Sequence, residues 1–339
     1  MIYFDLTKTA KAGHRSGLTR VSGRLAEGLG SSATNVGWSD WDRVMKPGDW
    51  FLTAELFSED ERSGITDFVR TAPGRKAAIF HDAIPLKFPE ITWPQSVARH
   101  PGYLKLLASF DRIWAVSAAS RDELLGFWRW QRIERVPPVE VLALGADFDG
   151  SARGSSGTDA TEPAPLLLCV GILEPRKNQM LLLNVAEELW SEGLGFELHV
   201  VGRVNPHFGG PIVKRIKALR RKFPGLRYHE AAKDKAVAEL YRRARASVFP
   251  TLAEGCGLPL IESLWRGVPC VCSDLPVLRE NSADGGCLAV TPNDARAWRD
   301  ALRRILTDDS VHARLAGEAM ARKLPTWSEA AATLKTALV

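Results

Sequence analysis

Short apolar runs alternate with amphipathic stretches along most of the 339 residues. In the first half, helices are predicted at Leu18–Leu29 and Ala119–Trp128, where apolar positions recur at helical spacing. Strands are predicted at four continuous apolar runs: Met1–Leu6, Trp50–Ala54, Ala77–Phe80 and Arg112–Val116. Strands this uniformly apolar are typical of parallel sheets that are covered by helices on both faces.

A second series of the same kind begins at residue 166, with the linker-like segment 151–165 before it. That segment is rich in glycine, serine, alanine and proline and has no hydrophobic periodicity. The strands predicted after it are Leu166–Val170, Phe196–Val201, Ala246–Phe249 and Pro269–Cys272, and the helices are Gln179–Trp190, Pro211–Phe223 and Pro259–Trp265. We therefore expect an α/β protein of two doubly wound, Rossmann-like domains, 1–150 and 166–320, that face a central cleft.

Composition excludes several other classes. An apolar fraction of 45% and a charged fraction of 25% are those of a globular chain, not of a disordered one. No run approaches 18 apolar residues, and the N-terminus lacks the basic and apolar regions of a secretory signal. Most of the five cysteines lie in or beside apolar runs, which favours buried thiols in a reducing compartment. These features predict a cytoplasmic protein.

One segment concentrates positive charge: Lys214–Lys222 holds six basic residues and no acidic one. The favoured interpretation is a solvated helix face. The alternative is a surface that contacts an anionic membrane at its inner face, or a phosphorylated substrate. Nucleic acid is not expected as a partner, because no interleaved aromatics and no recognisable binding module accompany the segment.

Two strand–loop–helix segments carry candidate chemistry in the second half. In residues 248–263, the glycines at 255 and 257 allow a close backbone approach to a ligand, and the helix start favours phosphate. In residues 170–179, a strand and a glycine turn precede Arg176 and Lys177 at another helix start. Two fixed cations can neutralise a diphosphate.

Together these segments resemble the retaining GT-B glycosyltransferases of the family-4 type. That family has a V-G-x-x-x-P-R-K-(N/G) turn and an E-x7-E motif, and residues 170–178 and 254–262 match them. Further segments resemble the family's in the same order: 199–202, 239–246, 264–276 and 327–331. The resemblance covers most of residues 166–339, and it implies that residues 321–339 form the family's closing helix.

The first half resembles the mannosyltransferase-like members more loosely. Gly17-Leu-Thr-Arg20 is similar to a glycine loop that lies near the donor diphosphate in that family, although an ordinary strand–helix turn explains it equally well. The segment 80–86, with His81 at its strand end, resembles an H-D-x-x-P motif and places His81 near the donor sugar. Ser117 and Ser120 match V-S-x-x-S, which we interpret as a helix cap.

By resemblance, the donor nucleotide binds the second domain and the acceptor mainly the first. The resemblance then implies four catalytic residues: Lys177, Arg176, Glu254 and His81. Glu254 holds sugar hydroxyls, Glu262 holds the ribose, and the helix-start N–H groups near Gly257–Leu260 assist the cations. The predicted donor-binding residues are Gly17, Gly171, Gly202, Arg203, Gly255, Cys256, Gly257, Leu258, Pro259 and Glu262.

Two departures from the family pattern change the site. Ile172 follows Gly171 where many relatives have an arginine, so the diphosphate must rest on Lys177 and Arg176, with Arg203 as a helper. Cys256 replaces the usual aromatic between the loop glycines, which loosens one wall of the sugar pocket.

The resemblance implies a hexosyltransferase of polysaccharide biosynthesis that retains the anomeric configuration. Its partners are a nucleotide-sugar donor and a glycan or lipid-linked acceptor. The first-half motifs favour GDP-mannose, with UDP- or dTDP-sugars next. Two alternatives remain: a nucleotide-sugar epimerase on the same fold, and a catalytically silent nucleotide-sugar-binding protein.

Other signatures are weak or missing. Two D-x-D triplets, at 40–42 and 147–149, do not follow long apolar strands, so we assign no metal, and we predict metal-independent transfer without a cofactor. The dinucleotide, P-loop and serine-hydrolase motifs do not occur in the chain.

Overall fold

The computed structural model of the protein describes residues 1–12, 16–147, 153–154, 164–230 and 232–338. These residues form two compact units. The first comprises Met1–Gly145 with Pro325–Val339, and the second comprises Ala146–Leu324. Most of the predicted linker, 151–165, lies outside the described residues, and the domain limits inferred from sequence stay a prediction.

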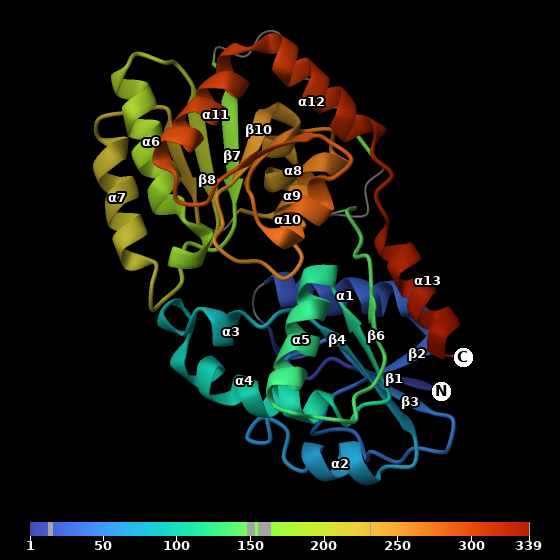
Figure 1. The fold of residues 1–339 in the computed structure, drawn as a ribbon. Helices are drawn as coiled ribbons and strands as arrows, with labels where there is room; N and C mark the ends of the chain where they lie inside the picture. Colours follow the sequence, from blue (N-terminus) through green and yellow to red (C-terminus); the bar gives the residue numbers. More distant parts are fainter. Residues whose placement is uncertain (13–15, 148–152, 155–163, 231, 339) are drawn as a thin grey trace. The chain divides into compact units, whose positions relative to one another are not determined.

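The first unit is built on a parallel sheet with the strand order β2-β1-β3-β4-β5-β6 (Figure 1). Its strands are β1 (Ile2–Asp5), β2 (Ala33–Val36), β3 (Trp50–Thr53), β4 (Arg75–Phe80), β5 (Arg112–Ala115) and β6 (Val139–Val141). The order reverses between β1 and β3, as it does in doubly wound sheets. Residues that follow β1 and β3 therefore meet at the carboxyl edge.

Helices cover this sheet. They are α1 (Gly17–Leu29), α2 (Ile65–Thr71), α3 (Ile84–Lys87), α4 (Pro94–Leu107), α5 (Ala118–Trp130) and α13 (Trp327–Leu338), with short 3-10 turns at Thr9–Lys11, Gly30–Ser32 and Pro89–Ile91. Apolar residues of α2, α4 and α5 pack in one core with Phe51, Phe80 and Ile113. Ser117 caps α5 by accepting a hydrogen bond from the backbone N–H of Ser120, as predicted.

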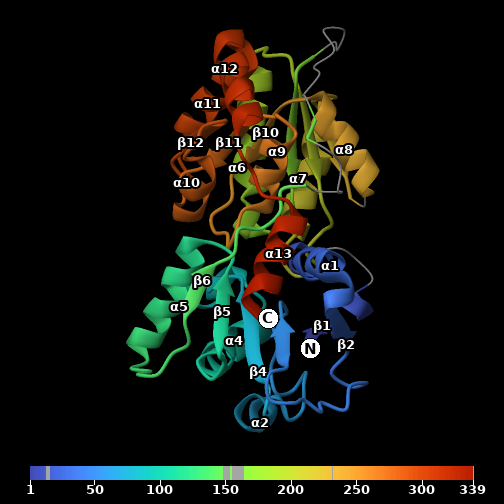
Figure 2. The ribbon, with the colours of Figure 1, turned by 90° about the vertical axis from the view of Figure 1, so that its right-hand side faces the viewer.

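The end of the chain belongs to the first unit, where α13 lies beside α1 (Figure 2). Gly28 of α1 permits this approach, since a Cβ there would lie 2.6 Å from the Cβ of Ala331. Trp327, the first residue of α13, is buried against the backbone of Gly145. Helix packing this close needs a residue without a side chain on one partner.

The second unit holds another parallel sheet, with the order β12-β11-β10-β7-β8-β9. Its strands are β7 (Leu166–Val170), β8 (Glu197–Val201), β9 (Leu226–His229), β10 (Ala244–Phe249), β11 (Cys270–Ser273) and β12 (Cys287–Val290). Its helices are α6 (Gln179–Ser191), α7 (Gly210–Arg220), α8 (Asp234–Arg243), α9 (Leu258–Trp265), α10 (Pro276–Ser282), α11 (Ala295–Thr307) and α12 (Asp309–Ala321), and a 3-10 turn spans Pro175–Lys177.

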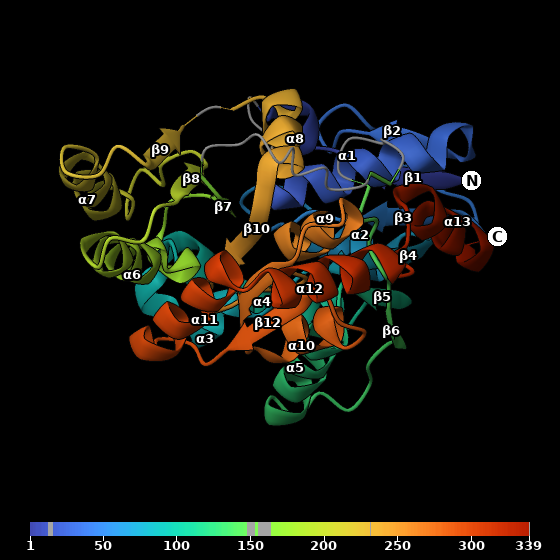
Figure 3. The same ribbon diagram turned by 90° about the horizontal axis from the view of Figure 1, so that it is seen from above.

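The strands of this sheet are buried on both faces. Leu167 and Cys169 of β7 point into a core with α6, α7, α11 and α12, whereas Leu166 and Leu168 point into a core with α8. Figure 2 shows α11 and α8 on opposite sides of the strands, and Figure 3 shows α7 next to α6. Alternation of this kind explains the continuous apolar runs in the sequence.

The order of the second sheet contains a point of divergence of the kind at which open α/β sheets bind ligands. The chain connections diverge at β7 and β10, which are neighbours in the sheet. In open α/β sheets, ligands bind beyond the carboxyl ends of strands at this point of divergence. The two loops that start there, residues 171–178 and 250–257, are the loops that carry the predicted motifs.

The basic segment Lys214–Lys222 lies on α7 and the turn after it. The apolar residues of α7, Ile212, Ile216 and Leu219, are buried in the core of the unit. Arg215 pairs with Glu187 of α6, so part of the charge of this segment is neutralised. Within the described residues, no helix is both long and apolar enough to cross a bilayer.

Candidate active site

The two loops at the divergence of the second sheet are tied together by hydrogen bonds. The N–H of Leu252 donates to the carbonyl of Arg176 at 2.7 Å, and the Arg176 guanidinium donates to the carbonyl of Ala253, also at 2.7 Å. The hydroxyl of Thr251 lies 3.2 Å from the Arg176 carbonyl. The turn after β7 and the turn after β10 therefore form one rigid site.

Lys177 is the buried cation of this site, with 9% of its surface exposed. It ends the 3-10 turn, and its aliphatic stem passes over Gly171, whose added Cβ would contact the stem at 3.6 Å. The ammonium lies 4.9 Å from the centre of the Phe249 ring. Burial lowers the pKa of Lys177 below its usual value, although the negative charge of Glu254 opposes the shift.

Glu254 receives three donors on one oxygen. Lys177 Nζ donates to Oε1 at 2.5 Å, the Thr251 hydroxyl at 2.7 Å and Arg176 Nη1 at 3.0 Å. Burial alone would raise the pKa of Glu254, but the charges of Lys177 and Arg176 hold it below the usual value. None of the described residues donates to Oε2, which leaves that oxygen as an acceptor for a ligand hydroxyl.

Arg176 is shared between two carboxylates. Besides Glu254, its guanidinium contacts Glu174 Oε1 at 2.7 Å, and Asn205 Nδ2 donates to the other oxygen of Glu174 at 3.0 Å. The four ionised groups of the site therefore carry no net charge. Our sequence analysis assigned no role to Glu174 or Thr251. Glu174 stands inside the quoted turn, and Thr251 stands three residues before Glu254.

The start of α9 offers fewer backbone donors than the sequence predicted. Pro259 has no N–H, and the N–H of Leu260 donates to the Gly257 carbonyl at 3.0 Å. The donors expected near Gly257–Leu260 are therefore reduced to those of Gly257 and Leu258. Gly257 has a φ of 82°, a conformation that favours glycine.

The remaining predicted residues of this loop are close to the cluster. Gly255 and Leu258 are buried, and Glu262 is buried within α9. Burial and the carboxylates of Glu254 and Glu262 raise the pKa of the Cys256 thiol to about 12. Cys256 is therefore a neutral wall residue at physiological pH and not a nucleophile.

Gly202 lies where β8 approaches the turn after β7. A Cβ at Gly202 would lie 1.9 Å from the carbonyl oxygen of Gly171, so no other residue fits without a backbone shift. Arg203 follows it at the same carboxyl edge, and its carbonyl accepts from the N–H of Leu173 at 2.9 Å. The side chain of Arg203 is exposed and forms no ion pair with any residue that the structure describes.

Two predicted residues lie in the first unit. His81, at the end of β4, is buried, and its Nε2 lies 2.7 Å from the carbonyl oxygen of Ala54. Because a carbonyl only accepts, Nε2 carries the proton; burial lowers the pKa of His81, so the ring is neutral. Gly17 is exposed and begins α1, directly after the capping residue Ser16. Both residues belong to the first unit, whereas Lys177 belongs to the second.

The first unit also contains a pocket of about 200 Å³ at the carboxyl side of its sheet. Its aromatic walls are Phe57, Trp93 and Tyr103. The charged side chains that line it pair with acids, since Lys8 and Arg99 both contact Glu61. The pocket adjoins the predicted site residue His81, because His100 Nε2 lies 3.1 Å from the carbonyl oxygen of Asp82.

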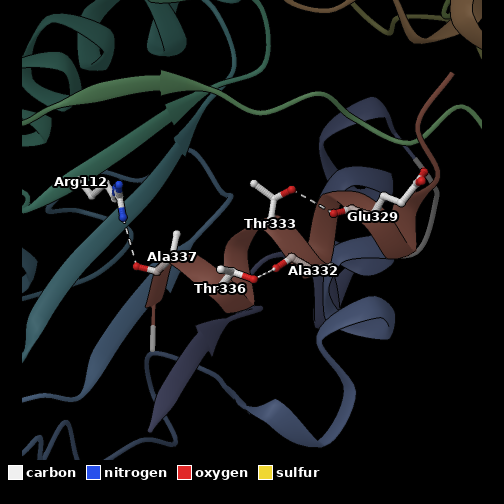
Figure 4. A pocket seen from close by; sticks show the side chains of 6 residues that line it. All are labelled: Arg112, Glu329, Ala332, Thr333, Thr336 and Ala337. Atoms are coloured by element: carbon white, nitrogen blue, oxygen red, sulfur yellow. Dashed lines mark hydrogen bonds between the residues drawn. The ribbon is translucent and has the colours of Figure 1, made fainter. Parts of the chain in front are cut away.

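A wider hollow of about 840 Å³ lies between β5 and α13 (Figure 4). Its arginine, Arg112, donates to the carbonyl of Ala337, and the hydroxyls of Thr333 and Thr336 donate to carbonyls of their own helix. Arg112 is the first residue of β5, so this hollow is at the amino edge of the sheet. We assign it no function.

Comparison with known families agrees with this geometry. Residues 156–322 match the family described as glycosyl transferases group 1. The matched range contains both loops and the whole ionic cluster. Residues 156–322 form a group 1 glycosyltransferase domain. The predicted recognition and enzyme class are confirmed at the level of the family.

The relatives of this chain include mannosyltransferases. This glycosyltransferase is 31% identical over 241 residues to the serotype-specific mannosyltransferase WbdA of Escherichia coli, which is 68% of this chain and 29% of that protein. It is 30% identical over 155 residues to the O-antigen chain mannosyltransferase RfbU of Salmonella typhimurium, covering 46% of this chain and 42% of that one. The match spans less than a third of the length of WbdA.

Solved structures show the fold. Sucrose-phosphate synthase from Thermosynechococcus elongatus superposes with a TM-score of 0.72 at 15% identity, over 99% of this chain and 97% of that one. Anabaena Alr3699/HepE, solved with UDP and glucose, gives a TM-score of 0.70 at 13% identity, over the same shares. The predicted α/β fold of two Rossmann-like domains, GT-B, is confirmed.

Proposed function

We propose that this glycosyltransferase moves a hexose from a nucleotide-sugar donor to a hydroxyl of a glycan or lipid-linked acceptor, with retention of anomeric configuration. The observation that carries the proposal is the ionic cluster of Lys177, Arg176 and Glu254 at the divergence of the second sheet, in which Lys177 is buried. The named mannosyltransferase relatives support GDP-mannose as the favoured donor, ahead of UDP- or dTDP-sugars.

In this proposal the departing diphosphate is held by fixed positive charge. Lys177 has three N–H donors, of which one donates to Glu254, so the others can reach a phosphate oxygen. Arg176 and the N–H groups of Gly257 and Leu258 add further donors. Such preorganised donors stabilise the negative charge that develops as the glycosidic bond breaks.

The sugar lies next to that charge. Oε2 of Glu254 accepts from a sugar hydroxyl, and Glu262 holds the ribose. The diphosphate oxygen takes the proton of the attacking hydroxyl on the same face of the sugar, which explains retention without a separate base. The proposal places the neutral ring of His81 near the donor sugar. It places Gly17, Gly202 and Arg203 near the diphosphate of the donor.

The acceptor, in this proposal, uses the pocket of the first unit that is lined by Trp93 and Tyr103. Aromatic rings cover the apolar face of a sugar. The ion-paired side chains of the pocket can form hydrogen bonds with the sugar hydroxyls. A volume of about 200 Å³ holds one ring and not a chain. We place the protein in the cytoplasm, where nucleotide sugars are made.

The experiment is an assay of purified protein with GDP-mannose and a panel of mannose oligosaccharides. Release of GDP with a product one hexose larger is expected, and the anomeric proton signal in NMR should show the configuration of the donor. Transfer should continue in excess EDTA, because Lys177 and Arg176 occupy the role of a metal. An inverted product, or loss of transfer on chelation with recovery on added manganese, would contradict the mechanism.

The two alternatives are less well supported. An epimerase needs an acid and a base on the sugar carbon, and the cluster offers a carboxylate whose pKa is held low. A silent relative would be expected to have lost Lys177 or Glu254, and both are present and in contact.

A further inference from the structure

The carboxyl end of α5 exposes an aromatic side chain among unpaired cations. Trp130, the last residue of α5, has 74% of its surface exposed, the largest exposure of any large apolar residue that the structure describes. Val136, six residues on, is 40% exposed. Arg129, Arg132 and Arg135 surround them in the sequence and are all exposed. We call these five residues the Trp130 patch.

The three arginines of the patch form no ion pair with the described part of the chain. The segment 129–136 holds one acid, Glu134, so it keeps a local excess of positive charge. Arg132 has a φ of 55°, at the turn that ends α5, where glycine is usually found. Arg132 therefore has a backbone conformation that favours glycine.

The basic segment on α7 lacks this combination. Its apolar residues are buried in the second unit, and Arg215 and Lys222 both face Glu187. Stable attachment to a membrane surface needs two signals, an apolar group and a cationic cluster. The segment on α7 has the cations alone, whereas the Trp130 patch has both.

We propose that the Trp130 patch docks on an anionic lipid bilayer. Tryptophan is enriched at membrane–water interfaces, where its ring lies at the level of the headgroups. Each basic residue near an anionic leaflet strengthens binding about fivefold, and this attraction decreases within a Debye length. The charges of the three arginines complement those of anionic headgroups. Trp130 and Val136 supply the apolar contact with the bilayer.

The test is sedimentation with vesicles of equal parts phosphatidylglycerol and phosphatidylcholine, at low and at high salt. Wild type is expected to bind at low salt and to be released at high salt. Arg129→Ser/Arg132→Gly should bind about thirtyfold more weakly, the equivalent of about 2 kcal/mol for two cations. Glycine fits the φ of residue 132, so this variant should fold. Trp130→Ser should also bind more weakly.

The matched control is Lys214→Ser/Arg221→Ser, which removes two exposed cations from the α7 segment. It should bind as wild type does. Equal loss in the control and the patch variant would show that net charge alone acts, and would overturn the proposal. So would a wild type that stays in solution at low salt, or equal binding to pure phosphatidylcholine. Self-association without lipid that Trp130→Ser abolishes would assign the patch to a second copy instead.

Discussion

Among single residues, Glu254 shows how the site can hold a cation ready for a phosphate. Its Oε1 accepts from Lys177, Arg176 and Thr251, so both cations are fixed before a ligand arrives. A buried cation without a partner would lose its proton or distort the fold. Glu254 therefore serves two purposes in our account: it keeps Lys177 charged, and it presents Oε2 to the sugar.

The protonation of Lys177 should be visible in the pH profile. Burial lowers the pKa of Lys177 below the value of about 10.4 that is usual for lysine. As the pH rises, the ammonium therefore loses its proton at a lower pH than an exposed lysine does. We expect kcat/KM to fall on the alkaline side as pH rises through that lowered pKa. Stopped assays across the pH range, with circular dichroism to confirm the fold, measure it.

Lys177→Arg provides the control for this prediction. A guanidinium stays charged throughout the range, so the weak residual activity of the variant should not fall at the same pH. An alkaline decrease that is unchanged in Lys177→Arg would assign it to another group.

Among the elements, the turns after β7 and β8 must almost touch for the site to form. Gly202→Ala would place a methyl group 1.9 Å from the Gly171 carbonyl oxygen. We expect a loss of about 3 kcal/mol in the free energy of unfolding, as for severe overpacking, together with displacement of the Lys177 turn. Urea unfolding of the variant measures the first effect, and donor binding measures the second.

Gly210→Ala is the matched control, because a Cβ there would meet nothing within 4 Å. It should be at least as stable as wild type, since alanine is the better helix residue. Equal stability of Gly202→Ala and Gly210→Ala would mean that the two turns are not as close as the structure has them.

The position of a strand in its sheet decided whether the sequence predicted it. The eight strands predicted from continuous apolar runs are all central strands, buried on both faces. The four that we missed, β2, β6, β9 and β12, are the sheet edges, where part of each strand is exposed. An edge strand does not need a continuous apolar run, so the pattern could not indicate it.

Site residues also differ in whether the sequence alone could indicate them. Lys177 and Glu254 were candidates from the sequence because each belongs to a motif with fixed spacing, and the structure brings the two side chains into contact. Glu174 and Thr251 could not be predicted, because their roles depend on two loops that are far apart in the sequence and meet at neighbouring strands. The loss of the Leu260 N–H to an internal turn is also a property of local geometry that a helix-start pattern does not specify.

At the scale of the whole molecule, the chain returns at its end to complete the first unit. Trp327 of α13 is 4% exposed and lies against the backbone of Gly145. Trp327→Ala should lower the free energy of unfolding by about 3–5 kcal/mol, because it opens a cavity between α13 and that backbone. Denaturant unfolding followed by circular dichroism measures the change.

Trp130→Ala is the control for Trp327→Ala, since it removes a tryptophan that is largely exposed. It should change stability by less than about 0.5 kcal/mol. If the two variants unfold alike, α13 does not stabilise the first unit.

The most direct test of the central claim is calorimetric titration of wild type and Lys177→Ala with GDP-mannose, UDP-glucose and dTDP-glucose. Wild type should bind GDP-mannose most tightly. Lys177→Ala should bind it about thirtyfold more weakly, since one charge-assisted hydrogen bond contributes about 2 kcal/mol. Lys217→Ala, which removes an exposed cation of α7, should bind as wild type does. A wild type that binds none of the three nucleotide sugars, or a Lys177→Ala variant that binds as tightly as wild type, would contradict the account.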